Sequence, residues 1–338
     1  MFGVGKISGK IHSFMKKADG FGITEKKDRI RALFDFLYCR TRFHVTLEEY
    51  LLYDFYRYKN SYRKYFLTAY QRRHSFRYVN KVWHTKSKMF MYGRMKELYG
   101  REIFSVSDHT AREFGDFVGK HGKVFIKPDK ASCGRGTEIF SYTTDSACRE
   151  KYDELAGRDM ICEEMISQHH ALEELCPSSV NSCRILTLLD HGEVNLIAAT
   201  IKMSKGEAFV DNLHANGIGA AVDTETGIVT TVGRDYLNRT YIEHPLTGRI
   251  IPGFRLPFWK ETVELVKKAH PLMPESAVIG WDVAFTENGP VLLEANGAPG
   301  PNIHQFADKE PKGRTIMSYI AKKENRAYDP KINRYPEK

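Results

Sequence analysis

Two acids and an amide near the C-terminal end of the sequence are the residues whose types and spacing most suggest chemistry. They lie in GWDVAFTENGPVLLEANG, where two apolar runs flank the turn signal ENG, a pattern typical of a β-hairpin. With the turn centred on Asn288, Asp282 and Glu294 lie directly opposite each other, and Asn296 points to the same face as Glu294. Like charges about 4.5–5.5 Å apart destabilise a strand pair. Either these side chains bind something between them, or they form an unpaired strand surface that faces solvent.

Residues 123–142, KVFIKPDKASCGRGTEIFSY, predict two strands joined by a glycine-containing loop. Small residues let backbone amides approach phosphate oxygens, and Lys127 at the end of the first strand supplies a point charge. The loop residues of interest are Ser132, Gly134, Arg135 and Gly136. The loop is not a Walker A motif, because GxxxxGK[ST] occurs nowhere in the chain. Taken alone, the segment fits both a phosphate-binding loop and an ordinary hairpin turn.

Three further segments place polar side chains at the ends of predicted strands. A run that ends in Glu163 and Glu164 can offer backbone groups to a purine and a carboxylate to a ribose or amine, although acids at strand ends are commonly just solvated. Arg184 can clamp a phosphate or a carboxylate bidentately, or it can form a surface salt bridge. Lys202 and Asn212 follow in IKMSKGEAFVDN. None of these residues decides a function by itself.

The composition indicates a folded chain whose charge is unevenly placed. The 338 residues are 42% hydrophobic, no apolar run is long enough for a membrane span, and the six cysteines include no CxxC pair. The N-terminal segment lacks the apolar stretch of a secretory signal, so we expect a cytoplasmic protein with free thiols. Residues 1–100 carry 22 Lys and Arg against 8 Asp and Glu, which is +14 in a chain of net charge +9. An anionic partner is therefore expected for this N-terminal part.

Hydrophobic periodicity predicts helices first and strands later. Residues 24–78 have apolar and aromatic residues at three- and four-residue spacing, with Thr46 and Glu49 as a capping box. Another helix is predicted to begin near Lys88 and to end at a Gly100 cap. The rest of the chain is dominated by short β-runs with turns, among them a hairpin with the turn DHG. This order predicts an α+β fold with antiparallel sheets and not a doubly wound parallel sheet.

The order of these segments resembles the ATP-grasp superfamily, and most closely its sugar-transfer associated group, which is related to α-L-glutamate ligases. The resemblance is carried by QHHALEELCPSSVNSCRI, VDN, HPLTG and IGWDVAFTENGPVLLEANGAPG, and it covers roughly residues 80–308. It implies an ATP-grasp fold, in which two α+β lobes with antiparallel sheets sandwich ATP. The implied organisation is a basic helical region (1–80), a helical lead-in (81–120), a nucleotide lobe with the glycine-rich loop (121–180), a C-terminal lobe with the metal site (181–310) and a polar extension (311–338).

The resemblance also implies roles for individual residues. Mg²⁺ between the β- and γ-phosphates of ATP would be held by Asp282, Glu294 and Asn296. The catalytic residues would be Arg184, which steadies the transferred phosphate or an oxyanion, Lys202 and Asn212. Lys86 is an alternative to Lys88 as the first phosphate-binding lysine. The residues implied to bind ATP are Lys88, Lys127, Ser132, Gly134, Arg135, Gly136, Glu163, Glu164, Met165, Ile166, Gln168 and His169.

Three positions depart from the family pattern. Gly280 stands where many ligases of the superfamily carry an arginine, Lys202 stands where related ligases often have arginine, and His170 stands where proline is expected. Lysine keeps the charge at its position but loses the planar fork of the guanidinium. Recognition of an acceptor carboxylate then has to come from elsewhere, for example from Arg184 or the basic N-terminal region.

The function implied by the resemblance is ATP-dependent ligation of a carboxylate to an amine through an acyl phosphate, with ATP and Mg²⁺ as cofactors. One hypothesis joins a sugar-linked carboxylate to an amino acid or amine in surface polysaccharide biosynthesis, with an anionic glycan or lipid-linked precursor at the basic N-terminal region. A first alternative is an ATP-grasp kinase that phosphorylates a hydroxyl or carboxylate. A second is a protein that binds an anionic polymer or membrane surface. No nucleic acid partner is expected, because the aromatic residues of the N-terminal helices have the spacing of a core.

Overall fold

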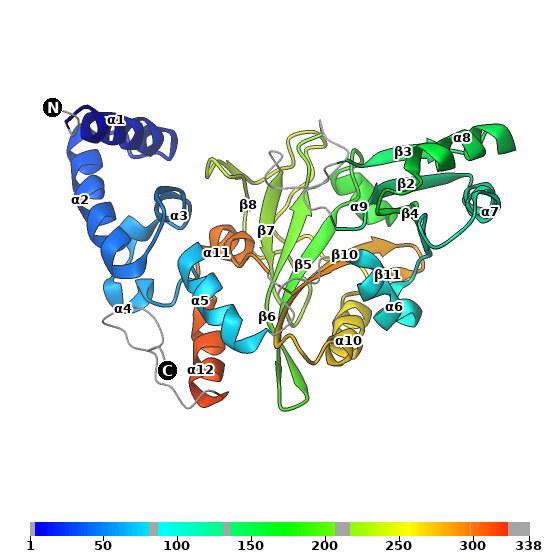
Figure 1. The fold of residues 1–338 in the computed structure, drawn as a ribbon. Helices are drawn as coiled ribbons and strands as arrows, with labels where there is room; N and C mark the ends of the chain where they lie inside the picture. The colour runs from blue at the N-terminus through cyan, green and yellow to red at the C-terminus, as the bar shows by residue number, and fades with distance from the viewer. Residues whose placement is uncertain (1–3, 81–86, 131–135, 207–216, 298, 324–338) are drawn as a thin grey trace.

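The computed structural model describes residues 4–80, 87–130, 136–206, 217–297 and 299–323. Figure 1 shows a helical N-terminal region, a small lobe built on a four-stranded sheet and a large lobe built on a seven-stranded sheet. Every strand pair in both sheets is antiparallel. The predicted α+β class is therefore confirmed. Among the described residues, no helix has both the length and the apolar character that crossing a bilayer requires.

The N-terminal region folds around a core of aromatic rings. Its elements are α1 (Val4–Gly20), α2 (Lys26–Phe43), α3 (Leu47–Leu52), η1 (Phe55–Arg57), α4 (Asn60–Arg63) and α5 (Ala69–Val79). The predicted capping box of Thr46 and Glu49 begins α3. The buried aromatic side chains of this core are Phe14, Phe36, Phe43, Tyr50, Tyr53, Phe55 and Phe66. Most of the aromatic residues in the basic helices therefore serve packing, as their spacing predicted.

The small lobe is a four-stranded sheet covered on one face by two helices. Its strands are β1 (Ile103–Ser105), β2 (Lys123–Pro128), β3 (Glu138–Ser141) and β4 (Met160–Glu164), in the order β1-β4-β2-β3, and its helices are α7 (Ala111–His121) and α8 (Asp145–Leu155). Val124, Ile126 and Cys162 pack beneath these helices. Side chains alternate along a strand, so Lys127 and Glu163 belong to the opposite face. The lobe includes β1 and α7 and thus begins before residue 121.

The large lobe is a seven-stranded sheet in the order β11-β10-β5-β6-β7-β8-β9. Its strands are β5 (Ser182–Asp190), β6 (Glu193–Met203), β7 (Ile218–Val222), β8 (Gly233–Arg234), β9 (Thr240–Tyr241), β10 (Val278–Thr286) and β11 (Gly289–Asn296). The predicted hairpin of β5 and β6 turns at His191 and Gly192, whose φ angles are 50° and 89°. Positive φ at both central residues is the mark of a type I′ turn, which matches the twist of the strands it joins.

The two faces of the large sheet carry different helices. One face packs against α6 (Lys88–Tyr99) and α10 (Trp259–Ala269), which continues into η3 (His270–Leu272). The other packs against α11 (Asn302–Asp308), α12 (Gly313–Lys323) and α5. Ile316, Met317 and Ile320 of α12 are buried in that core. The prediction of a polar extension from residue 311 is therefore wrong for residues 313–323, because their apolar side chains recur at helical spacing and pack on the sheet.

A buried histidine beneath the large sheet makes folding stability depend on pH. The Thr187 hydroxyl lies 2.8 Å from His270 Nδ1 and accepts from the indole N–H of Trp281 at 2.8 Å. The Nε2 of His270 donates to the carbonyl of Ser276 at 2.9 Å. Burial lowers the pKa of His270 from 6.5 to about 4. Between these two values the unfolded chain binds a proton that the folded chain does not, so the free energy of unfolding falls as pH falls.

We expect urea unfolding to show a stability loss of up to about 3 kcal/mol between pH 7 and pH 4 that is due to this histidine. His270→Gln should lower stability at pH 7 and flatten the pH dependence in that range. If wild type and variant have the same pH slope, His270 does not control it.

Candidate active site

A bulge in the hairpin of β10 and β11 sets which residues face each other. The register near the turn, continued along the strands, would place Leu293 opposite Asp282. A bulge next to Asp282 leaves Leu293 out of the ladder and brings Glu294 opposite Asp282. The predicted pairing of the two acids is confirmed. Its cause is the bulge and not a turn centred on Asn288, since such an extra residue shifts the register by one.

Glu294 and Asp282 belong to a polar row that crosses four neighbouring strands. Asp282 of β10 is opposite Glu294 of β11 and Arg184 of β5, and Arg184 is opposite Thr200 of β6. Directly opposed residues share a face of the sheet. Lys202 lies two residues beyond Thr200 and therefore joins the same face. The residues next to this row in sequence, such as Trp281, point into the apolar core on the other side.

Asp282 is a buried anion held by two cations. Arg184 donates Nε and Nη2 to the two carboxylate oxygens at 2.6 Å each, and Lys202 Nζ lies 3.1 Å from Oδ1. Burial alone would raise the pKa of Asp282, but Arg184 and then Lys202 outweigh it and hold the pKa well below its usual range. Asp282 is therefore ionised at neutral pH. The ion pairs also orient Arg184 and Lys202 along the sheet face.

The residues expected to hold Mg²⁺ have the right chemistry for it. Two carboxylates and an amide supply the hard oxygen ligands that Mg²⁺ prefers, and Asp282 and Glu294 face each other. A carboxylate has about four lone-pair sites, so the three contacts to Asp282 leave one on Oδ2. Within the described residues, the buried side-chain nitrogen of Asn296 has no hydrogen-bond partner. Exchanging the two ends of that amide would present its oxygen instead. The set therefore fits a hard divalent cation.

His304 of α11 extends the polar row beyond Thr200. Its Nδ1 lies 2.8 Å from the Thr200 hydroxyl, and within the described part of the chain its buried Nε2 has no hydrogen-bond partner. Burial, and then the charge of Arg184, lowers the pKa of His304 well below 6.5, so the ring is neutral at neutral pH. His304 is not among the site residues predicted from sequence. Its position beside the row depends on how α11 packs on β6, which the local sequence does not reveal.

A second charged cluster lies on the small lobe. Lys127 Nζ is 2.6 Å from Glu163 Oε2, and Arg101 Nη1 is 2.8 Å from the same oxygen. Burial would raise the pKa of Glu163, but Arg101 and Lys127 outweigh it and keep the pKa below its usual value. Burial, with Arg101 and Lys88 nearby, lowers the pKa of Lys127 despite its contact with Glu163. Glu163, proposed from sequence as part of an adenine-binding hinge, thus holds Lys127, the predicted phosphate-binding lysine, in place.

Arg101 connects this cluster to the bulge in β11. Besides its ion pair with Glu163, it donates Nε to the carbonyl of Leu292 at 3.2 Å and Nη2 to the carbonyl of Leu293 at 3.3 Å. Leu293 is the residue that the bulge leaves out of the ladder. Arg101 is thus the link between Lys127 and the strand segment that carries Glu294. Arg101 is not among the site residues predicted from sequence, although it directly follows the predicted Gly100 cap.

Lys88 begins α6 and lies close to Lys127. Its Nζ donates to the carbonyls of Pro128 and Asp129 at 3.2 and 2.9 Å, and Ser87 caps the helix by accepting from the amide of Phe90. The helix ends at Gly100, whose φ of 72° is left-handed. Both ends of α6 therefore agree with the prediction. The structure brings the two predicted phosphate-binding lysines together at the end of β2.

The glycine-rich loop is described only at its end. Gly136 has a φ of 72°, and a Cβ there would lie 3.2 Å from Pro128. Glycine is favoured at this position for both reasons. Four loop or phosphate-binding predictions lie outside the described residues, namely Ser132, Gly134, Arg135 and the alternative Lys86, and so does the predicted catalytic residue Asn212.

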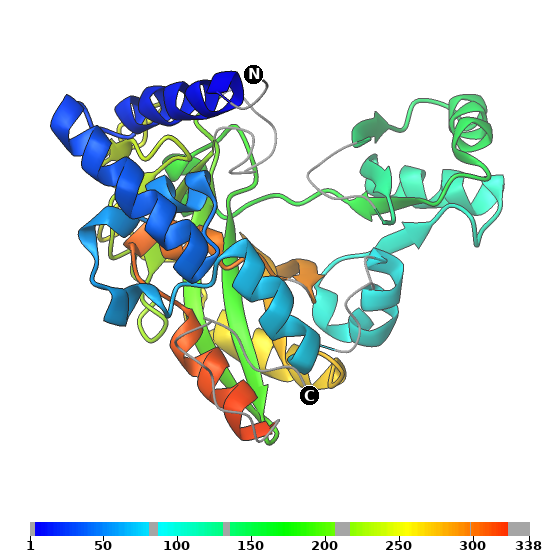
Figure 2. The same cartoon turned by 60° about the vertical axis from the view of Figure 1, so that its left-hand side comes forward.

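The segment between β4 and β5 joins the two lobes. Glu164 ends β4 and accepts from the amide of Glu102, and half-buried Met165 and Ile166 follow it. The side chain of Gln168 is engaged within the protein, since it accepts from Asn181 and donates to the carbonyl of Cys176. Its predicted contact with ATP would therefore have to come from its backbone. The connection is visible in Figure 2, where the small lobe stands to one side of the large sheet.

Three residues of the hinge and the β10–β11 turn form a second group with metal-ligand atoms close together. His169, His170 and Glu287 place these atoms within 4.8 Å of one another. His169 Nδ1, however, accepts from the amide of Ala171 at the start of α9 (His170–Leu175), so Nε2 carries the proton in the neutral ring. An N–H cannot coordinate a metal. The side chain of His169 therefore caps α9 and contacts Glu287. Its contact with ATP stays a prediction.

Two sequence motifs of the resemblance meet behind the hinge. Thr247 of HPLTG donates to the carbonyl of Leu175 at 2.8 Å, and His244 of the same motif contacts the carbonyl of Ser204 at 2.8 Å. Burial would raise the pKa of Cys176, but hydrogen bonds from His244, Ser178 and Ser204 lower it to about 6. These contacts tie the hinge to the end of β6, which carries Lys202. The motifs therefore support the site without forming it.

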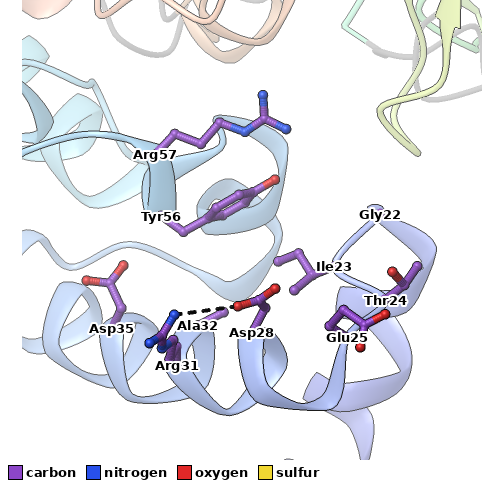
Figure 3. Close-up of a pocket in the computed structure, with 10 residues that line it drawn as sticks. All are labelled: Gly22, Ile23, Thr24, Glu25, Asp28, Arg31, Ala32, Asp35, Tyr56 and Arg57. Atoms are coloured by element: carbon purple, nitrogen blue, oxygen red, sulfur yellow. Dashed lines mark ion pairs between the residues drawn. The ribbon is translucent and has the colours of Figure 1, made fainter.

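A cavity of about 400 Å³ lies apart from this site, in the N-terminal region. Figure 3 shows it between α2, the turn before α2 and Tyr56 and Arg57 of η1. Charged residues of both signs line it, and Asp28 and Arg31 form an ion pair of 3.8 Å at its edge. It contains none of the residues assigned to ATP or metal.

Gly280 is a position where the structure leaves no room for a side chain. A Cβ there would lie 2.7 Å from the Cβ of Pro299 and 3.4 Å from the Cδ of Arg184. The chain after β11 folds back onto the sheet at this point, and Arg184 uses the adjacent space. The arginine that many ligases carry at this position therefore has no equivalent here.

We expect Gly280→Ala to lower the free energy of unfolding by about 1–3 kcal/mol, as overpacking of a filled site does. It should also reduce activity, because Arg184 is displaced from Asp282. Thermal denaturation would measure the change in stability, and steady-state ADP release would measure the change in activity. Ala284→Gly, at a buried position of the same strand, is the matched control. Unchanged stability of Gly280→Ala would show that Pro299 and Arg184 leave room for a Cβ at this position.

One family of known proteins matches most of the chain. Residues 62–314 match the family described as sugar-transfer associated ATP-grasp. The chain belongs to this family. No match was found among curated protein sequences.

Solved structures that resemble this ATP-grasp chain are distant in sequence. The ATP-grasp ligase PsnB, complexed with minimal precursor, Mg and ADP, is 11% identical with a TM-score of 0.43, over 70% of this chain and 59% of PsnB. D-alanine–D-alanine ligase from Bacillus anthracis is 11% identical with a TM-score of 0.40, over 71% and 67%. Carboxyaminoimidazole ribonucleotide synthase from Aspergillus clavatus, complexed with ATP, is 13% identical with a TM-score of 0.41, over 66% and 50%. This chain thus spans about three fifths of the length of PsnB.

Proposed function

We propose that this protein is an ATP-dependent ligase that joins a carboxylate to an amine through an acyl phosphate. The observation that carries the proposal is the row of Glu294, Asp282, Arg184 and Lys202 on the large sheet. It combines acids suited to Mg²⁺ with cations suited to phosphate. Lys88 at the start of α6 and Lys127 at the end of β2 lie together. Lys127 is linked to the row through Glu163 and Arg101.

In the first step, the residues of the chain position charges and supply no nucleophile. A substrate carboxylate oxygen forms a bond to the γ-phosphorus of ATP, the bond from that phosphorus to the β–γ bridging oxygen breaks, and ADP leaves. Lys88 and Lys127 would neutralise the α- and β-phosphates. Arg184 and Lys202 would balance the charge on the transferred phosphoryl group. When bound at Asp282, Glu294 and Asn296, Mg²⁺ would neutralise the β- and γ-phosphate oxygens.

In the second step, an amine nitrogen attacks the acyl carbon, the bond from that carbon to the phosphate oxygen breaks, and phosphate leaves as the nitrogen loses a proton. The negative oxygen of the tetrahedral intermediate needs a donor that is already in place. Arg184 fits this role, because its ion pair with Asp282 fixes the guanidinium at the sheet face. Holding both reactants in place supplies much of the remaining acceleration.

For the substrates, we propose a sugar-linked carboxylate, such as a uronic acid, and an amino acid or amine in surface polysaccharide biosynthesis. The support is the name of the family, together with the balance of +14 in residues 1–100, which favours a polyanionic acceptor. With no space for a side chain at Gly280, binding of the acceptor carboxylate is assigned to Arg184.

The test is a screen of uronic acids and amines for ADP release, with the mass of each product measured. Ligation gives a product equal to the sum of the two substrates less one water, and it needs both of them. Lack of ADP release with every pair, in a protein that binds Mg²⁺ and ATP, would contradict ligase activity toward these substrates.

Kinase activity is the second candidate, and the lack of room at Gly280 is the observation that favours it. A hydroxyl acceptor does not need the arginine that is missing there. A kinase would release ADP without an amine and give a stable product whose mass has increased by one phosphoryl group. The same screen therefore separates the two functions.

A further inference from the structure

The outer side of α2 carries an apolar stripe that is exposed in the described part of the chain. The side chains of Ile30, Phe34, Leu37 and Tyr38 are 41%, 68%, 49% and 45% exposed. Their spacing of four, seven and eight residues places them on one side of the helix. The opposite side, which includes Phe36, packs into the aromatic core. Figures 1 and 2 both show α2 at the edge of the molecule.

Exposed cations border this stripe. Lys26, Lys27, Arg31 and Arg40 are exposed, and the helix as a whole has six Lys and Arg against two Asp, a balance of +4. At 100° per residue, Lys27 and Arg31 lie between or beside Ile30 and Phe34. Of the two acids, Asp35 is bound bidentately by Arg63 and so adds no free negative charge to the surface. The stripe is thus a group of large apolar side chains within a positive surface.

We propose that this side of α2 docks on an anionic lipid surface. Phe and Leu side chains beside Lys and Arg are the composition of helices that lie in the plane of a membrane interface. The apolar side chains would enter the boundary between headgroups and acyl chains, while Lys27, Arg31 and Arg40 contact anionic headgroups.

The positive charge around the stripe, together with its apolar side chains, disfavours two other partners, a second copy of this chain and a nucleic acid. A second copy of this chain would bring the same cations of two α2 helices against each other in a two-fold dimer, which is repulsive. A nucleic acid would neutralise the cations but leave the four apolar side chains in water. An acidic protein would satisfy both features, and it would be favoured if the chain failed to bind vesicles that contain anionic lipid alone.

The experiment is flotation of the full chain with vesicles of phosphatidylcholine, with and without phosphatidylglycerol. We expect binding to the phosphatidylglycerol vesicles that weakens as salt is raised. The double variants Phe34→Ser with Leu37→Ser, and Lys27→Gln with Arg31→Gln, should each weaken it by about tenfold or more.

Matched controls are Ile242→Ser, which removes an apolar side chain that is 63% exposed on the large lobe, and Lys267→Gln with Lys268→Gln on α10. These should bind like wild type. All the variants alter exposed side chains, so their melting temperatures should also match wild type.

Absence of binding to phosphatidylglycerol vesicles at low salt would overturn the proposal, as would equal losses in the control variants. Self-association that the Phe34 and Leu37 variant abolishes, without vesicle binding, would identify a dimer surface and also overturn it. Vesicle binding is measured without ATP or acceptor, so its failure is distinguishable from failure of the ligase proposal.

Discussion

Glu294→Gln is expected to lower ATP turnover by on the order of 100- to 1,000-fold while leaving the fold intact. Glu294 is half-buried and faces Asp282, but unlike Asp282 it forms no ion pair with another described residue. Its substitution therefore removes the predicted metal ligand without leaving the charge of a described ion-pair partner uncompensated. Steady-state ADP release at saturating ATP measures the effect, and urea unfolding checks the fold.

Asp282→Asn is the variant with which Glu294→Gln is compared. It should abolish turnover too, but it leaves Arg184 and Lys202 facing a neutral amide. Removing one member of a buried ion pair costs about 3–5 kcal/mol. We therefore expect Asp282→Asn to be less stable than Glu294→Gln. Substantial turnover in both variants would contradict the assignment of the metal site.

Arg101→Met is expected to damage both stability and activity. Arg101 is buried, shares Glu163 with Lys127 and satisfies two carbonyls at the bulge of β11. Its removal should cost about 3–5 kcal/mol in the free energy of unfolding. It should also reduce kcat, because the segment that places Glu294 opposite Asp282 loses its support.

Lys127→Met is the matched variant for this prediction. Lys127→Met removes the other cation that pairs with Glu163. The contacts with the bulge carbonyls are made by Arg101 and stay in place in this variant. We expect it to raise the KM for ATP by roughly 10- to 100-fold, as loss of a charge-assisted phosphate contact does, with a smaller effect on kcat. If Arg101→Met changes only the KM for ATP, like Lys127→Met, then Arg101 does not position the bulge.

The features that could be predicted from sequence are those with local causes. The α+β class, the helix from Lys88 to Gly100 and the I′ hairpin of β5 and β6 all follow from periodicity, caps and turn residues. The facing of Asp282 and Glu294 was predicted correctly for the wrong reason. A turn-centred count happened to give the register that a bulge produces, and nothing local in the sequence indicates that Leu293 is the residue left out.

The features that were missed depend on contacts between distant parts of the chain. Arg101 and His304 lie next to the predicted site only because α6 and α11 pack on the large sheet. Gln168 was assigned to ATP because it lies in a hinge motif, whereas the fold uses its side chain to hold Asn181. The position of a residue in a motif predicts that it lies near the site. Its tertiary contacts decide what its side chain does there.

The most direct test is a crystal structure with Mn²⁺ and a non-hydrolysable ATP analogue, measured at a wavelength where manganese scatters anomalously. Mn²⁺ substitutes for Mg²⁺ at oxygen-ligand sites. Our account predicts anomalous density in contact with oxygens of Asp282, Glu294 and Asn296, with the analogue's phosphates reaching Lys88 and Lys127. Bound analogue with no metal density at these three residues, or with these acids turned away from it, would contradict it.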